Sequence, residues 1–362
     1  MGDLYKSSPI ANDKLELFNA TAEEIKRYQV FNGDLFFTRS SIVPSGIAFC
    51  NWYRCSEKKA VVFDSHVVRF KTNTDVVNPM YLYLACIRPD ARKYFLANAK
   101  TATMTTIDQT VLGRCPIPYP ALKEQAAIAE AVSDADSLIS SLQKLIEKKK
   151  AIKQGAMQEL LTGKKRLPGF SGEWSKQQLG DICNIVNGGT LSTSIAEFWN
   201  GKILWCTPTD ITSCSTKYIY TTESKITESG LKASSATLLP KGALLLCSRA
   251  TIGEVRIAGN TICTNQGFNS LVVHQNISNE WLYYMVHVLK FNMLEKAIGS
   301  TFLEISKKDL AELDIIVPEF TEQKAIAQVL SDMDSEIELL EKKLAKYQQI
   351  KQGMITGRIR LV

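Results

Sequence analysis

Two long stretches of the chain carry the same pattern of hydrophobic and polar positions. In the first stretch, apolar residues recur at steps of four and three, at Ile128, Val132, Ala135, Ile139, Leu142 and Ile146. In the second, they recur at Ile326, Leu330, Met333, Ile337, Leu340 and Leu344. These steps place one apolar stripe along one face of an α-helix, and such a stripe needs a partner to be buried. We therefore predict two long helices that pack against each other as an antiparallel coiled coil.

The two stripes belong to a longer internal repeat. Residues 124–139 read EQAAIAEAVSDADSLI, and residues 322–337 read EQKAIAQVLSDMDSEI, with no gap between them. The paired aspartates recur in both copies, which indicates a role at the helix interface rather than in acid–base chemistry. A looser match extends upstream to Gly33 and Gly242. A match of this density predicts that the chain contains two copies of one structural unit.

The segments outside the two helices mix short β-rich runs with helical ones. The β-rich runs are Leu35–Phe37, Ala60–Phe63, Ile203–Trp205, Ala243–Leu246 and Ser270–Val273, and the helical ones are Met80–Asn98 and Trp281–Glu295. We therefore expect an α+β fold with two globular mixed α/β domains separated by the two spacer helices. The expected domains are 1–119, 120–166 (central spacer helix), 167–317 and 318–362 (C-terminal spacer helix). Counted back from Gly33, the first domain is shorter than the second, so we expect it to be N-terminally incomplete.

Composition narrows the class of protein without fixing it. The net charge of +6 suits an anionic partner, although many basic proteins bind no nucleic acid. No apolar run approaches the ~18 residues that a membrane span needs, and residues 1–6 lack the apolar core of a signal peptide. We expect a cytoplasmic protein with no membrane partner.

The sequence contains none of the motifs of several common enzyme classes. The nine cysteines form no Cys-x-x-Cys pair, the three histidines are dispersed, and neither a phosphate-binding P-loop nor a Gly-x-Gly-x-x-Gly fingerprint occurs. One near miss is Asn78-Pro-Met-Tyr81, which resembles the Asn-Pro-Pro-Tyr of amino-methyltransferases. The same tetrapeptide also suits the start of a helix. The sequence therefore predicts a chain without catalytic, metal-binding or cofactor-binding residues, and a degenerate methyltransferase stays open as an alternative.

Several motifs together resemble one known family. They are Pro120-Ala-Leu-Lys-Glu-Gln125, Pro318-Glu-Phe-Thr-Glu-Gln323, Leu167-Pro-Gly-Phe-Ser-Gly-Glu-Trp174, Gly188-Gly-Thr-Leu-Ser192, Trp205-Cys-Thr-Pro-Thr-Asp-Ile211 and Ser248-Arg-Ala-Thr-Ile-Gly253. This combination, which covers almost the whole chain, resembles the specificity subunit of type I restriction-modification systems. The resemblance implies two target recognition domains that each read half of a bipartite sequence in double-stranded DNA.

The same resemblance implies partners and the location of the chemistry. Two methyltransferase subunits and restriction/translocase subunits would assemble on the chain, with S-adenosylmethionine and ATP bound in those partners and no cofactor in this chain. Two further alternatives stay open at this point. One is a truncated or silent recognition-domain cassette of the same family, and the other is a coiled-coil scaffold that reads no DNA.

Polar residues in the β-rich loops are the candidates for DNA contact. Arginine can fork onto guanine, and glutamine can pair with adenine, through the major groove. In the second domain the candidates are Thr190, Ser192, Thr193, Thr207, Asp210, Arg249, Thr251 and Gln266, and in the first they are Arg39 and Ser40 near the place of Arg249. Each of them could instead cap a loop or contact a phosphate.

Overall fold

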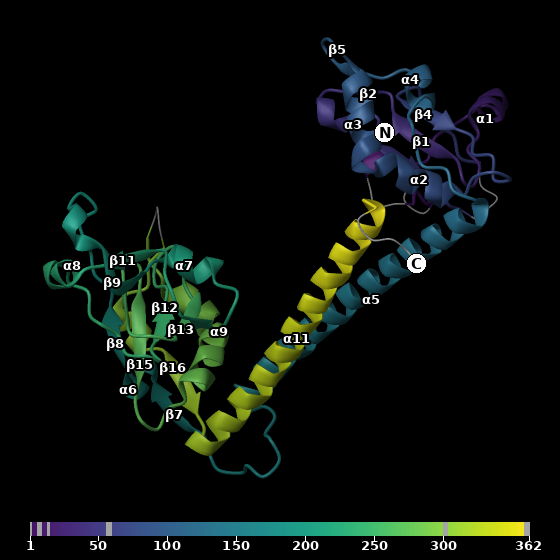
Figure 1. Ribbon diagram of the computed structural model, residues 1–362. Coiled ribbons are helices and arrows are strands. Elements are labelled where there is room, and N and C mark those ends of the chain that lie inside the picture. Colours follow the sequence, from purple (N-terminus) through teal and green to yellow (C-terminus); the bar gives the residue numbers. More distant parts are fainter. Residues whose placement is uncertain (1, 6–8, 13–14, 56–59, 300–302, 358–362) are drawn as a thin grey trace. The chain divides into compact units, whose positions relative to one another are not determined.

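The repeated stripes fold into two long helices in the computed structural model, which describes residues 2–5, 9–12, 15–55, 60–299 and 303–357. Helix α5 spans Leu122–Leu160 and helix α11 spans Phe320–Ile355 (Figure 1). The stripe is buried as expected at Val132, Leu142 and Ile326, among others. Each helix stops shortly before a glycine with φ +71°, at Gly163 and Gly357. Glycine adopts this left-handed conformation without steric cost, and it ends the helix.

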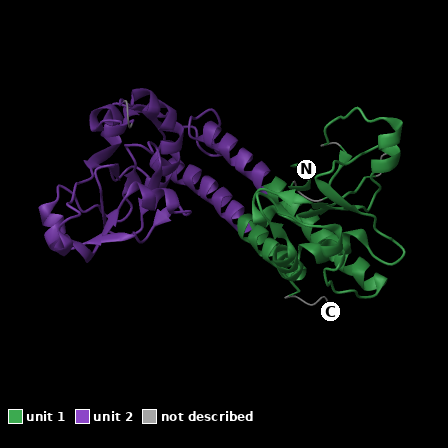
Figure 2. Cartoon of the chain, turned by 90° about the horizontal axis from the view of Figure 1, so that it is seen from above, with its two compact units in different colours: residues 1–145, 340–362 green, residues 146–339 purple. Residues whose placement is uncertain are grey.

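The chain divides into two compact units, and each contains one end of both long helices (Figure 2). One unit comprises residues 1–145 with 340–362, and the other comprises residues 146–339. In the first unit, Lys351 Nζ lies 2.5 Å from Asp136 Oδ1. In the second unit, the repeat-related pair is Lys153 and Asp334, also at 2.5 Å. Partner numbers fall along α11 as they rise along α5, so the predicted antiparallel pairing is confirmed.

The interface role expected for the repeated aspartates is confirmed at Asp136 and Asp334. Asp134 and Asp332 are exposed instead, and Asp332 accepts from Gln328 of its own helix at 2.7 Å. Both ion pairs are partly exposed to solvent, so each contributes only about 0–1 kcal/mol to stability. The two ion pairs fix the register of the helices. Asp136 of the first copy pairs with Lys351 of the second, and the equivalent Asp334 pairs with the equivalent Lys153. The two helices are therefore related by a local two-fold pseudosymmetry.

The second unit is built from mixed sheets with helices packed on them. Its strands are β7 (Ser175–Gln178), β8 (Cys183–Asn187), β9 (Trp199–Cys206), β10 (Tyr218–Ile219), β11 (Ser224–Ile226), β12 (Leu244–Leu246), β13 (Val255–Ala258), β14 (Ile262–Thr264), β15 (Asn269–Val273) and β16 (Asp314–Val317). Its helices are α6 (Leu179–Ile182), η4 (Ala196–Phe198), α7 (Pro208–Ser213), α8 (Glu228–Ala233), α9 (Asn279–Lys296) and α10 (Lys307–Ala311). The strand orders are β10-β13-β12-β15-β8, β11-β9-β14 and β16-β7.

The first unit is a smaller version of the same plan. Its strands are β1 (Leu35–Thr38), β2 (Ser40–Ser41), β3 (Cys50–Trp52), β4 (Val67–Phe70), β5 (Lys100–Thr101) and β6 (Thr105–Thr106). Its helices are η1 (Gly2–Tyr5), α1 (Ala22–Tyr28), η3 (Pro44–Gly46), α2 (Pro79–Ile87), α3 (Pro89–Asn98) and α4 (Gln109–Gly113). The sheets run β3-β1-β4 and β2-β6-β5.

Corresponding strands show that the duplication extends to the sheets. Strand β1 lies antiparallel between β3 and β4, and β12 lies antiparallel between β13 and β15. The backbone N–H of Gly33 donates to Tyr53 at 2.8 Å, and that of Gly242 donates to Ala258 at the same distance. The expected α+β fold with two mixed units and an antiparallel helix pair is therefore confirmed.

One buried glutamine anchors each long helix to its own unit. The Gln125 side chain accepts from Asn78 N at 2.9 Å and donates to the Pro120 carbonyl. Gln323 makes the equivalent bonds to Ser278 N and the Pro318 carbonyl. Both glutamines are fully buried, so losing either would leave backbone groups unpaired in the interior. The Glu-Gln motif that opens each helix is therefore a structural clamp.

Two local predictions are wrong. The segment predicted as one helix from Met80 to Asn98 is two helices, α2 and α3, because Pro89 forces Arg88 out of the helical region to ψ 151°. The run Ala60–Phe63 forms no strand and makes only an isolated bridge between Val62 and Gln29. By contrast, the helix predicted over Trp281–Glu295 is confirmed as α9. No helix in the described part of the chain is both long and apolar enough to cross a membrane.

Candidate nucleic-acid interface

Three loops of the second unit meet at one edge of its sheets. Gly188 N donates to the Phe268 carbonyl at 3.1 Å, and Gly189 N donates to the Thr264 carbonyl at 2.9 Å. Ser248 N donates to the Gly267 carbonyl at 2.9 Å, which brings the turn after β12 to the same place. The two leading glycines are required, because a Cβ on Gly188 would lie 1.6 Å from a backbone oxygen. The motifs singled out in the sequence therefore form one loop cluster.

Five of the candidate residues in this cluster expose their side chains. They are Thr190, Ser192, Thr193, Arg249 and Gln266. The first three follow β8, and the backbone carbonyl of Ser192 is held by the indole N–H of Trp199 at 2.9 Å. Arg249 stands in the turn after β12, and Gln266 stands in the turn after β14. The structure thus brings together, at one surface, hydroxyl, amide and guanidinium groups from distant parts of the sequence.

Thr207 and Asp210, which were expected to contact DNA, form a structural cap in the loop after β9. They form a capping box that opens α7: Thr207 N and Oγ1 donate to Asp210 Oδ2 at 2.8 and 2.6 Å. The second carboxylate oxygen accepts from Glu223 N at 2.9 Å. Both carboxylate oxygens are thus held by groups of the chain itself. Thr207 and Asp210 therefore hold the loop in shape.

Thr251 also differs from its expected role, because its hydroxyl oxygen is buried beside the Cys247 thiol. Burial raises the pKa of that thiol to about 11, and the Thr251 side chain partly offsets the rise. Thr251 therefore packs toward the interior of the turn. Its backbone N–H donates to the Arg249 carbonyl at 2.7 Å, while its hydroxyl points away from the exposed surface of the loop cluster.

The side chain of Arg249 forms an ion pair that sequence reasoning missed. Arg249 Nε lies 3.9 Å from Glu304 Oε2, and the two side chains are 46% and 50% exposed. Glu304 and Ile298 exchange two backbone hydrogen bonds, both 3.0 Å long. An ion pair so exposed contributes at most about 1 kcal/mol, so an incoming phosphate or base can compete for the guanidinium. Glu304 therefore orients the Arg249 side chain and leaves its guanidinium able to contact a phosphate or a base.

The first unit places Arg39 and Ser40 at the corresponding position. Ile107 N donates to the Arg39 carbonyl at 3.1 Å, just as Ile305 N donates to the Ser248 carbonyl at 3.0 Å. Ser40 pairs with Thr106 of β6, so a hairpin flanks this turn as well. Arg39 is exposed and Ser40 is half-buried. The exposed hairpin residues Lys100, Thr101 and Thr106 are functional candidates that the sequence reasoning overlooked, although the recurring hairpin position was a usable signal.

The chemistry-bearing groups of the second unit are mostly structural. His287 is buried, and burial together with the nearby Lys153 lowers its pKa to about 4, so the imidazole is neutral near pH 7. The Tyr284 hydroxyl donates to Asp334 at 2.7 Å, and burial together with this bond raises the pKa of Tyr284.

In the first unit, Asn78 caps α2 by accepting from Tyr81 N at 3.0 Å, and the Tyr81 hydroxyl donates to the Pro118 carbonyl. The near miss to a methyltransferase motif is therefore a helix cap. Within the described residues, no cluster of three or more potential metal ligands occurs.

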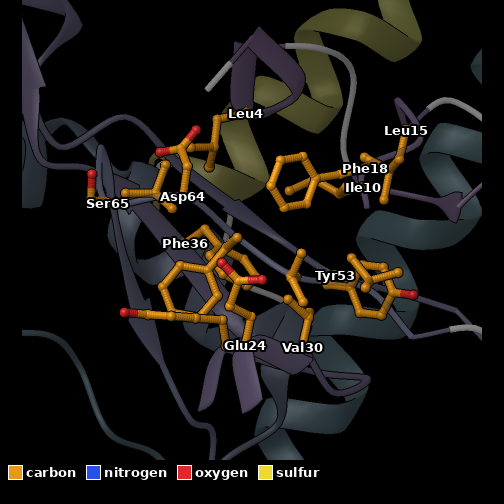
Figure 3. Close-up of a pocket in the computed structure, with 15 residues that line it drawn as sticks. Leu4, Ile10, Leu15, Phe18, Glu24, Val30, Phe36, Tyr53, Asp64 and Ser65 are labelled. Atoms are coloured by element: carbon orange, nitrogen blue, oxygen red, sulfur yellow. The ribbon is translucent and has the colours of Figure 1, made fainter. Parts of the chain in front are cut away.

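The outer face of the first unit's sheet holds an apolar cavity of about 430 Å³ (Figure 3). Phe36, Tyr53 and Val30 line it, with Glu24 and Asp64 among its few charged groups. In the second unit, the residue corresponding to Phe36 is Leu245, which is fully buried in a cluster with Cys206 and other core residues. Strand β15 pairs with both β12 and β8, whereas β4 pairs only with β1 among the described strands. The first unit is therefore less thoroughly packed on this face.

We expect limited proteolysis to cut the first unit before the second. Local opening is easier where fewer apolar contacts hold the segment, and proteases cleave the opened form. Brief digestion with trypsin and mass assignment of the first cuts should place them within residues 15–119 rather than within 167–299. Equal resistance of both regions would show that the cavity does not weaken the first unit.

The fold and its loops define a duplicated recognition protein, in which polar loops are presented twice on one scaffold. The family described as "Type I restriction modification DNA specificity domain" matches residues 4–154 and again residues 171–350. The chain therefore belongs to the type I restriction-modification DNA specificity family.

Individual relatives agree with this placement. The chain is 40% identical over 168 residues to the "Type I restriction enzyme MjaIX specificity subunit" of Methanocaldococcus jannaschii, covering 46% of this chain and 39% of that protein. It is 23% identical over 326 residues to the MjaVIII specificity subunit of the same organism, covering 84% of this chain and 75% of that protein. With the EcoR124I/EcoR124II specificity subunit of Escherichia coli, it shares 26% identity over 260 residues, 66% of this chain and 62% of that protein.

Solved structures share the fold. The S subunit from M. genitalium superimposes with a TM-score of 0.54 at 16% identity, over 93% of this chain and 85% of that one. The HsdS subunit from Thermoanaerobacter tengcongensis gives a TM-score of 0.51 at 17% identity, over 90% of this chain and 80% of that one.

Proposed function

We propose that this chain is the non-catalytic DNA-specificity subunit of a type I restriction-modification complex. It reads a bipartite target in double-stranded DNA and directs methyltransferase and restriction subunits to that target. One observation carries the proposal: the chain builds the same exposed turn twice, at Ser248-Arg249 and at Arg39-Ser40, and a matching backbone hydrogen bond, from Ile305 and from Ile107, holds each turn. Two related reading surfaces fit two half-sites. S-adenosylmethionine and ATP would then be bound by the partner subunits.

Within the second unit, the proposed reading set is Arg249 and Gln266 with Thr190, Ser192 and Thr193. Arginine and glutamine present paired donors or donor–acceptor pairs to base edges, and short hydroxyl side chains fit either bases or phosphates. In the first unit, Arg39 and Ser40 are joined by the hairpin residues Lys100, Thr101 and Thr106. Two methyltransferase subunits would be recruited to each chain.

The direct test is to sequence methylated adenines in a host that carries this chain with its methyltransferase subunits. A single bipartite methylated sequence that disappears when the chain is deleted supports the proposal. A silent cassette would give no methylation. A scaffold that reads no DNA would leave a methylation pattern unchanged by loop substitutions, and the purified complex would lack DNA affinity that falls steeply with salt.

We expect the isolated chain to bind no S-adenosylmethionine. Asn78, the first residue of the segment that resembles a methyltransferase motif, caps α2 by accepting from Tyr81 N. The Tyr81 hydroxyl donates to the Pro118 carbonyl, just before α5. Equilibrium dialysis with labelled S-adenosylmethionine measures this directly, with a purified methyltransferase subunit as positive control. Stoichiometric binding at micromolar concentration would refute the non-catalytic assignment.

A further inference from the structure

One buried asparagine of the second unit connects two segments of the loop cluster. Asn269, the first residue of β15, is 3% exposed, and its Cα lies opposite that of Asn187 on the adjacent strand β8 (Figure 1). Asn269 Oδ1 accepts from Asn187 Nδ2 at 2.9 Å, and Asn269 Nδ2 donates to the Ile305 carbonyl at 3.1 Å. The buried amide therefore has a hydrogen bond at each of its two ends.

The oxygen end of this amide holds the loop that follows β8. Asn187 is the last residue of β8, and the loop with Thr190, Ser192 and Thr193 follows it closely. The backbone of Asn187 is paired with β15, so its side-chain bond is a second attachment where the chain leaves the sheet. The three exposed hydroxyl groups therefore start from a fixed point.

The nitrogen end holds the segment beside the Arg249 turn. Ile305 N donates to the carbonyl of Ser248, the residue before Arg249, at 3.0 Å. Glu304, the residue before Ile305, forms the ion pair with Arg249. Because Asn269 binds the Ile305 carbonyl, it restrains the segment that sets both the turn and its ion pair.

The first unit has a different residue at this place. Arg39 N donates to the His66 carbonyl at 2.9 Å, and the equivalent bond of the second unit ends on the Gly267 carbonyl at the same distance. Two residues further along, the first unit has Val68 where the second has Asn269. Val68 is buried and its side chain forms no hydrogen bonds. An apolar side chain therefore suffices for packing here, which indicates that the asparagine has another role.

We propose that Asn269 is a positioning residue for the half-site that the second unit reads, an inference that rests on the proposed function. Its amide holds the loop after β8 and the Arg249 turn in one fixed arrangement, so that hydroxyl and guanidinium groups meet the DNA together. Asn269 itself is buried and does not touch DNA. Losing one of its bonds leaves a polar group unpaired in the interior, so the arrangement is held firmly.

Asn269→Asp in the assembled complex tests this role. The carboxylate still accepts from Asn187 but cannot donate to the Ile305 carbonyl, so affinity for the target should fall on the order of tenfold. Affinity for unrelated DNA should stay the same, because phosphate contacts carry no sequence information. The matched control is Asn184→Asp, the same change at an exposed position of β8, which should alter neither affinity.

A double-mutant cycle shows whether Asn269 acts through the Arg249 turn. In an Arg249→Ala background, Asn269→Asp should lower target affinity less than threefold, because the guanidinium that it positions is already gone. A general loss of stability would instead lower the affinity by the full factor in both backgrounds. Melting temperatures show whether each variant is folded. Asn187→Ala, at an exposed residue, removes the other bond of the same amide and should also lower selectivity.

Two results would overturn the positioning role. One is an unchanged target affinity and methylated sequence in both Asn269→Asp and Asn187→Ala. The other is full additivity of Asn269→Asp with Arg249→Ala. Failure of the proposed function looks different, because the wild-type complex would then prefer no DNA sequence and Arg249→Ala would change nothing.

Discussion

Replacing Arg249 with alanine should relax recognition of one half of the DNA target. The guanidinium stands exposed at the loop cluster, and its Nε lies 3.9 Å from Glu304 Oε2. Loss of one forked contact to a base costs about 1–3 kcal/mol, or roughly 5- to 150-fold in affinity for the correct sequence. We expect the assembled complex to bind its target that much more weakly, and its methylated sequence to relax at one half only. Binding by the purified complex and methylome sequencing measure the two effects.

Two companion variants separate base reading from charge. Arg249→Lys keeps the charge but loses the fork, so it should retain the salt dependence of binding and still lose selectivity. Lys148→Ala removes an exposed charge from α5 and should change affinity for target and unrelated DNA alike, if at all. If Arg249→Ala left both the affinity and the methylated sequence untouched, the reading surface would lie elsewhere.

Lengthening both long helices by four residues should widen the gap between the two half-sites. Four helical residues add about 6 Å of rise and slightly more than one full turn, so the residues beyond the insertion keep nearly the same direction. DNA rises about 3.4 Å per base pair, so the gap should grow by one or two base pairs. The insertions belong after Leu145 in α5 and after Leu339 in α11, where one compact unit gives way to the other. The methylome of a host with this variant reports the new gap.

Insertions of other designs serve as controls for the same helices. Two residues in each helix would add about 200° of rotation, and methylation of the bipartite target should disappear. Four residues in α5 alone should destabilise the pair, because Asp136–Lys351 and Asp334–Lys153 cannot then both keep their register. An unchanged gap in the doubly lengthened variant would show that the helix pair does not set the distance.

The sequence was most informative where one physical pattern extends over many residues. The stripes that include Val132 and Leu330 repeat often enough to define two helices and their mutual burial. Local breaks were harder to read. Pro89 splits α2 from α3, and a proline rule applied at Arg88 would have found that split. Ala60–Phe63 has the composition of a strand, yet whether it forms one depends on a neighbouring strand, which no local pattern reveals.

The candidate site could be located by its motifs but not resolved into roles. Thr207 and Asp210 are a cap, and the signal was present, because proline at the first helical position follows the threonine and an acid follows three residues after it. The pairing of Arg249 with Glu304 could not be predicted, since it joins segments far apart in sequence. The burial of the Thr251 hydroxyl also depends on how the turn packs on Cys247.

The division of the chain into units has a consequence for its synthesis on the ribosome. The second unit is one continuous stretch, residues 146–339, so everything it needs has been made once Leu339 emerges. The first unit also needs residues 340–357, which are made last; Met354 and Ile355 of this stretch lie at the same groove as Ile128. Domains usually fold in the order in which they are made. Here the unit that is begun first is completed last, so its unfinished apolar face must wait through the synthesis of the entire second unit.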